Sequence, residues 1–218
     1  MKKSTTTLLT ATAVFCSCTH RSESTPTAGG GKTPTPTKHA TSRPTSRFSS
    51  RHEYAETNGA RILLHNSFPK SRLHYTDLTG RHYVYAVFWT QIINQTPTSL
   101  DVAIEFPADS FELPAASGNY IRLLIPPDTL TPAKEPLADY GLAVQPFLDQ
   151  HVRTPTALRR TIRPTDSSAF YVVTLATRGV GGTLRTGFSL EHPNLVYRVN
   201  EQAIPGGKMD LKKLMFPK

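Results

Sequence analysis

The side chains that could do acid–base chemistry in this sequence are a few carboxylates near its middle. Asp101 and Glu105 fall on the polar face of an alternating segment, and paired carboxylates are the acid and base of glycoside hydrolysis. Four residues of extended chain separate them by roughly 13 Å, whereas the carboxyl groups of glycosidases lie about 5–9.5 Å apart. The pair therefore indicates a solvent-exposed sheet face that its carboxylates keep polar. A hydrolase would need further carboxylates from other strands.

Metal and nucleophile chemistry is not indicated by the remaining residues. None of the eight His residues stands in an H-x-H or H-E-x-x-H spacing, and His74 and His82, with Asp77 between them, are typical of solvated loop residues. There is no G-x-S-x-G elbow, and the Gly-rich segment 179–182 lacks the Lys-Ser/Thr of a phosphate loop. We predict a protein without catalytic residues, metal or cofactor.

A local basic cluster is the first candidate binding surface. It consists of Arg159, Arg160 and Arg163, with Arg153 nearby. On a strand, Arg159 and Arg163 share one face while Arg160 points with the apolar residues on the other. The cluster could bind an acidic glycan or a protein partner. Alternatively, it is a solvated edge whose charges discourage strand-to-strand aggregation.

A set of aromatic residues is the second candidate. Tyr75, which begins a predicted loop at 75–80, is retained as a possible binding residue. Together with other rings it could form a platform on which sugars stack, but most of these rings occupy apolar strand positions, where core packing is favoured. The set comprises Tyr75, Tyr83, Tyr85, Trp89 and Tyr120.

The segments that must position these residues alternate between apolar and polar residues, as β-strands do. The stretch 81–111 holds the only Trp; residues 83–93 are apolar on both faces and residues 100–106 on one. We predict that these form two long antiparallel strands at the centre of the core. Further strands are predicted at 60–65, 120–125, 158–162, 169–175, 184–190 and 195–199, and one short helix within 136–151.

This pattern of about eight or nine short strands predicts an all-β fold. We expect an antiparallel β-sandwich of the immunoglobulin-like type. A jelly roll or a partly open barrel is the alternative. The absence of β-α alternation excludes a doubly wound α/β fold.

The amino terminus carries two lysines and a short apolar run, the pattern of a secretory signal peptide. The run ends in Phe15-Cys16-Ser17-Cys18. This resembles the lipobox of bacterial lipoproteins, in which a small residue precedes a cysteine that is diacylated on sulfur and becomes the first residue. The resemblance implies a signal peptide at 1–17 and lipidation of Cys18, although Phe15 and Cys16 depart from the usual residues. Cys16 as the modified residue, a cleaved signal without lipid and a Cys-x-Cys metal site are the alternatives.

The segment 18–50 is rich in Ser, Thr and Pro and predicts a disordered tether. It carries +4 of the formal charge of +9, residues 1–17 carry +2, and the domain predicted at 51–218 carries +3. Because the excess charge lies outside that domain, nucleic-acid binding is not predicted. A basic tether instead fits an anionic membrane surface, or is a solvated spacer.

These observations predict an envelope lipoprotein, anchored to the outer membrane or the periplasmic face by its lipid, and otherwise secreted. Its β-sandwich is expected to be a non-enzymatic binding or scaffold module for an envelope protein partner. A carbohydrate-binding module and a hydrolase are the alternatives.

Overall fold

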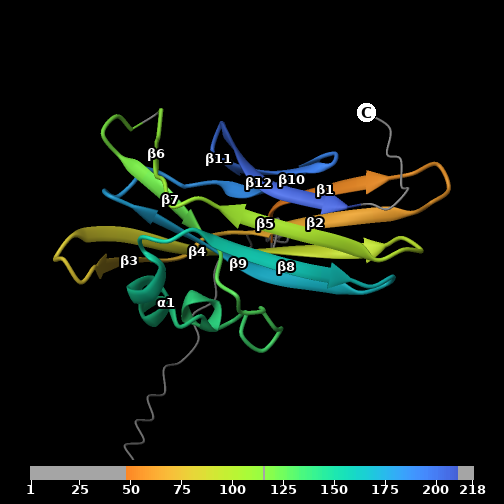
Figure 1. The fold of residues 1–218 in the computed structure, drawn as a ribbon, viewed down its shortest axis with the longest axis horizontal. Coiled ribbons are helices and arrows are strands. Elements are labelled where there is room, and N and C mark those ends of the chain that lie inside the picture. Colours follow the sequence, from red (N-terminus) through yellow and green to blue (C-terminus); the bar gives the residue numbers. More distant parts are fainter. Residues whose placement is uncertain (1–47, 115, 211–218) are drawn as a thin grey trace, which may run out of the picture. The chain divides into compact units, whose positions relative to one another are not determined.

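A computed structural model describes residues 48–114 and 116–210 (Figure 1). The predicted signal peptide, the predicted lipidation site Cys18 with its alternative Cys16, and residues 18–47 of the predicted tether lie outside the described residues. The described part contains the 3-10 helix η1 (Ala138–Gly141), the helix α1 (Val144–His151) and twelve strands: β1 (Phe48–Ala55), β2 (Arg61–Ser67), β3 (Lys70–Thr76), β4 (His82–Gln95), β5 (Leu100–Phe106), β6 (Phe111–Glu112), β7 (Tyr120–Leu124), β8 (Thr156–Ile162), β9 (Ser167–Ala176), β10 (Thr186–Glu191), β11 (Asn194–Val199) and β12 (Gln202–Asp210).

The strands form two antiparallel sheets that share a core. The larger sheet has seven strands in the order β1-β2-β4-β9-β7-β6, with β3 also paired to β4, and the smaller has the order β10-β11-β12-β5-β8. Phe88 and Ile92 of the larger sheet and Ile104 and Phe106 of the smaller belong to one cluster of buried residues. The predicted all-β fold with two antiparallel sheets and one α-helix is confirmed.

Strand β4 is apolar on both faces because both faces are covered. It pairs with β2 and β3 along one edge and with β9 along the other. Phe88 and Ile92 face the smaller sheet, whereas Tyr85 and Trp89 belong to a second core that includes residues of η1 and α1. The predicted central position of this strand is confirmed.

The predicted pairing of 83–93 with 100–106 is wrong, because these segments lie in different sheets. β5 pairs with β8 and β12 and has no ladder with β4. Alternation of apolar and polar residues shows which face of a strand is buried. It does not show which strand pairs with it and which strand packs across the core. The crossover is held by buried Asn94, whose Nδ2 donates to the carbonyls of Thr98 (2.8 Å) and Ile162 (3.0 Å).

The second core is covered by the segment that contains η1 and α1. Val144, Phe147 and Leu148 recur at helical spacing and are buried on one face of α1. Tyr140 packs edge-on against Trp89 at 6.3 Å between ring centroids. The helix predicted within 136–151 is confirmed, and it serves as a lid over the larger sheet (Figure 1).

A second buried amide ties the two sheets together. Asn66 of β2 is 1% exposed. Its Oδ1 accepts from the Thr90 hydroxyl (2.7 Å) and the Phe188 N–H (3.0 Å), while its Nδ2 donates to the Ser50 hydroxyl (2.9 Å) and the Phe188 carbonyl (3.0 Å). β10 is an edge strand of the smaller sheet, so its outer side has no neighbouring strand. The Asn66 amide supplies the hydrogen bonds to the Phe188 N–H and carbonyl that such a strand would otherwise supply.

Three strands differ from the prediction. β1 begins at Phe48, inside the predicted tether, because the Phe48 ring packs edge-on against Trp89 at 5.7 Å. β3 and β12 are not predicted from the sequence, since Pro69 and the Pro205-Gly206-Gly207 run interrupt their alternation.

Candidate functional site

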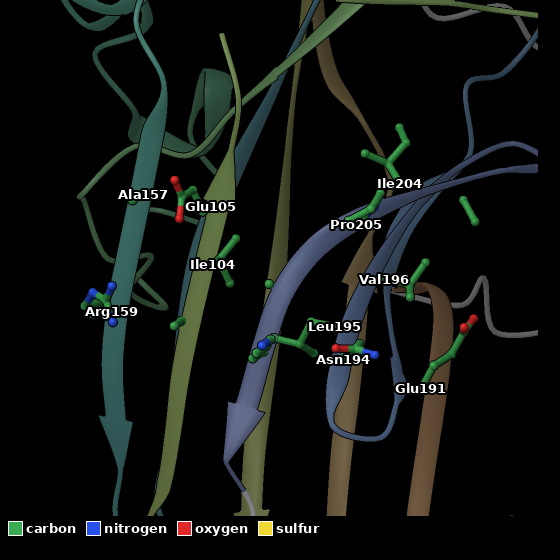
Figure 2. Close-up of a pocket in the computed structure, with 14 residues that line it drawn as sticks. Ile104, Glu105, Ala157, Arg159, Glu191, Asn194, Leu195, Val196, Ile204 and Pro205 are labelled. Atoms are coloured by element: carbon green, nitrogen blue, oxygen red, sulfur yellow. The ribbon is translucent and has the colours of Figure 1, made fainter. Parts of the chain in front are cut away.

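A cavity of about 740 Å³ opens in the outer face of the five-stranded sheet, where β12 separates from β5 (Figure 2). The ladder between these strands begins at the pair Asp101 and Asp210 and ends at the pair Ile104 and Gly207. Beyond that point β5 continues to Phe106, and the remainder of β12 pairs only with β11. We call this opening the β5–β12 cleft.

Two glycines create the cleft. The register between β11 and β12 shifts after Leu195, which leaves Gly206 as the extra residue of a β-bulge. Gly207 has a φ of +133°, and a side chain there would collide with the carbonyl of Ala103. A bulge bends its strand and increases its twist, so β12 turns away from β5 at this point.

One row of outward-facing residues crosses all five strands at the cleft: Arg159 of β8, Ala103 of β5, Lys208 of β12, Asn194 of β11 and Glu191 of β10. Glu191 forms a salt bridge with Arg198 at 2.7 Å. Neither Arg159 nor Lys208 forms a salt bridge with another described residue. These two cations therefore flank the small side chain of Ala103 and have no salt-bridge partner among the described residues. Glu105 lines the same cleft further along β5 (Figure 2), and Asp101 and Asp210 line a neighbouring hollow together with Arg159 and Lys208.

The walls of the cleft are apolar and lack aromatic rings. Ile104 and Leu195 are buried in the shared core yet line the opening, and Val196, Ile204 and Pro205 complete the apolar lining (Figure 2). No aromatic residue is among the described residues that line it. The cleft can hold an apolar side chain next to a negatively charged group, but it offers no ring on which a sugar could stack.

The structure separates the four predicted arginines. Arg159 lines the cleft, whereas Arg160 lies on the other face of β8 and donates to the carbonyl of Pro127 at 2.7 Å. Arg163 is exposed beyond the end of β8. Arg153 follows α1 and contacts Asp77 at 3.3 Å. The predicted cluster is therefore not a single surface, and only Arg159 belongs to the cleft.

Tyr75 is a core residue of β3 and not a surface residue of a loop. It is 2% exposed, and its hydroxyl donates to Asp149 at 3.1 Å. Burial raises the pKa of Tyr75 and of Tyr85 to about 12, with a further contribution from the carboxylates that their hydroxyls contact. Trp89 and Tyr85 are buried as well, so core packing of the central aromatic residues is confirmed and they form no exposed platform.

The carboxylates do not converge. Asp101 accepts a hydrogen bond from Thr161 at 2.7 Å, on the outward face of β5. Asp77 is buried and closes the β3–β4 turn. Hydrogen bonds from the Thr79 hydroxyl, and from the backbone N–H groups of Arg81 and Thr79, hold its pKa well below its usual range. Within residues 48–114 and 116–210, no group of three or more His, Cys, Asp or Glu residues could hold a metal ion.

Sequence reasoning missed the residues that complete the cleft. Lys208 and the glycines belong to β12, which the alternation does not predict, and Asn194 and Glu191 fall at a turn. Only the Pro-Gly-Gly run signals a bulge.

No protein-family model, curated protein or solved structure matches this chain. In the part of the chain that the structure describes, no helix is long and apolar enough to cross a membrane.

Proposed function

We propose that this protein is a lipid-anchored envelope protein whose β-sandwich binds an extended, acidic peptide segment of a protein partner. The observation that carries the proposal is the β5–β12 cleft. There Arg159 and Lys208, which form no salt bridge with another described residue, flank Ala103 beside an apolar opening between two strands. The lipid anchor rests on the lipobox-like residues that end at Cys18 and on the signal-peptide pattern before them.

The shape of the cleft favours a peptide over a compact ligand. β5 and β12 diverge at the Ile104–Gly207 pair, so Glu105 and Phe106 have no ladder partner on the β12 side. An added strand can pair with such an open edge, while pockets for its side chains give specificity. The small side chains of Ala103, Ala157 and Ala203 allow a backbone to approach the sheet closely.

The charge of the cleft favours an acidic segment. A carboxylate that lies over Ala103 would meet Arg159 on one side and Lys208 on the other. The adjacent apolar lining can then bury a neighbouring side chain of the same peptide. A glycan is less well served, because aromatic rings are missing from the lining.

Binding is tested with an array of extended peptides that differ in acidic content, together with a glycan panel. We expect acidic peptides with an apolar neighbour to bind. Arg159→Glu should weaken this binding at least tenfold and Ala103→Trp should block it, whereas Arg163→Glu, outside the cleft, leaves it unchanged. Binding to glycans alone, or equal losses in the Arg159 and Arg163 variants, would overturn the proposed peptide site.

Anchoring is tested separately by acyl labelling and membrane fractionation. Wild type should carry the acyl label and sediment with membranes, and Cys18→Ala should lose both properties. Cys16→Ala is the matched control, which should keep both. A soluble, unlabelled wild type would refute the lipid anchor and leave the peptide site to be judged on its own assay.

A further inference from the structure

A second cavity, of about 390 Å³, lies on the lid-covered side of the seven-stranded sheet, next to the end of α1. Three arginines line it: Arg81 after the β3–β4 turn, Arg122 of β7 and Arg153 after α1. No Asp or Glu is among the described residues that line it. We call it the Arg122 pocket.

Arg122 is the most unusual of the three. It is 8% exposed, and its guanidinium donates to the carbonyls of Val152 and Thr154 in the turn that follows α1. Its Nε has no hydrogen-bond partner among the described residues. A buried guanidinium with an unused donor and no carboxylate contact is costly, so an anion bound beside Arg122 would offset this cost.

The three arginines differ in whether a carboxylate contacts them. Arg153 contacts Asp77 at 3.3 Å and the Thr79 hydroxyl at 2.8 Å. Arg81 forms no salt bridge with a described residue. Asp109 attracts Arg122 electrostatically but does not line the pocket. Two guanidinium groups, those of Arg81 and Arg122, therefore remain without a carboxylate contact.

Hydroxyl groups complete the lining. Tyr83, Tyr120, Ser110 and Thr177 all border the pocket, and Tyr120 is 43% exposed. The Thr177 hydroxyl already donates to Asn119 at 3.3 Å and accepts from the Tyr120 N–H at 3.1 Å, so it is not a free donor for a ligand. Planar guanidinium forks and hydroxyls are the groups that hold phosphate oxygens in proteins. The charge of Arg81 and Arg122, neither of which contacts a carboxylate, matches a phosphate monoester, which carries about −1.5 to −2 charges at neutral pH.

We propose that the Arg122 pocket binds the phosphate group of a phosphomonoester, a site distinct from the peptide cleft on the other sheet. A free phosphometabolite and a phospholipid headgroup present the same chemistry. The pocket volume suits a single phosphate group with a small attached body.

The test is calorimetric titration of the full chain with inorganic phosphate, at constant ionic strength. Acetate serves as the singly charged control ligand. We expect saturable binding of phosphate, at least tenfold tighter than that of acetate. Because Arg122 also holds the lid and its variants can unfold, exposed Arg81→Gln is the decisive variant, with an expected loss of at least tenfold. The matched control is Arg185→Gln, at an exposed arginine that directly precedes β10 of the other sheet, and it should stay within twofold of wild type.

Two further binding measurements identify the source of the phosphate group. Glycerol phosphate tests a soluble ester, and phosphatidylcholine vesicles with added phosphatidic acid test a lipid headgroup. Loss of either interaction in Arg81→Gln supports the site and names its ligand. If phosphate and both esters fail to bind wild type, or if Arg185→Gln loses as much affinity as Arg81→Gln, the proposal is wrong.

Discussion

Replacing Asn66 with alanine should destabilise the domain more than any change on its surface. The substitution removes four hydrogen bonds and leaves the Phe188 N–H and carbonyl without their partner inside the core. Each net hydrogen bond contributes about 0.5–1.5 kcal/mol, and a buried group left unpaired costs about 1–3 kcal/mol. We therefore expect Asn66→Ala to lower the free energy of unfolding by about 3–5 kcal/mol, a large share of the stability of a single domain.

Equilibrium unfolding in urea, followed by the fluorescence of buried Trp89, measures this loss. The control is Gln95→Ala, which removes an exposed amide at the end of β4 and should change the stability by less than about 0.5 kcal/mol. Thr90→Val removes one of the four bonds, and in a double-mutant cycle its cost should be smaller in the Asn66→Ala background. A loss below about 1 kcal/mol for Asn66→Ala would refute the view that this amide joins the sheets.

Three further predictions concern the lid and the titrating residues. Arg122→Met should lower the free energy of unfolding by about 2–3 kcal/mol, because its two charge-assisted hydrogen bonds to the turn after α1 are lost. Protease cleavage near residue 150 should then be faster, and the control Arg185→Met should show neither effect. Burial, assisted by Arg198, lowers the pKa of His52 below its ordinary value of about 6.5. The unfolded chain therefore takes up this proton first as the pH falls below 6.5, and stability should decrease from pH 7 to pH 5, less steeply in His52→Gln; equal slopes would contradict this. Burial raises the pKa of Tyr75, Tyr85 and Tyr171 to about 12, whereas tyrosine in the unfolded chain titrates near 10. Stability should therefore fall as the pH rises above 10. The absorbance of tyrosinate should show a late phase in the pH titration, and a single transition near 10 would be inconsistent with the burial of these residues.

The fold class follows from sequence because period-two alternation directly reports a half-buried strand. The alternation of β5 and the two-faced pattern of β4 are both correct in the structure. Strand partners do not follow, since Ile92 and Val102 are equally apolar whether their strands pair or face each other across a core. Asn94 holds the crossover in the structure, but the run Asn94-Gln-Thr-Pro97 is just as typical of a turn.

Part of the candidate site can also be predicted from the sequence. Arg159 can be identified because it stands in a basic run, and period-two alternation gives its face of the strand. The same reasoning places Arg163 on that strand, which is wrong because β8 ends at Ile162. Lys208 could not be associated with it, because their proximity depends on two ladders that converge on Ala103. The Arg122 pocket could not be predicted from the sequence, because Arg81, Arg122 and Arg153 come from three separate segments and have no common spacing.

The buried amides that join the two sheets are separate from the charged residues of the cleft. The described residues include no cysteine, so the sheets are joined by packing and by the buried amides of Asn66 and Asn94. At the cleft, by contrast, the ladder ends, and the outward row of residues presents Arg159, Ala103 and Lys208 beside the apolar lining. Stability and binding should therefore be separable: Arg159→Glu should leave the unfolding transition in place while it removes peptide binding. Asn66→Ala should lower the transition, yet leave affinity unchanged at temperatures where the domain remains folded.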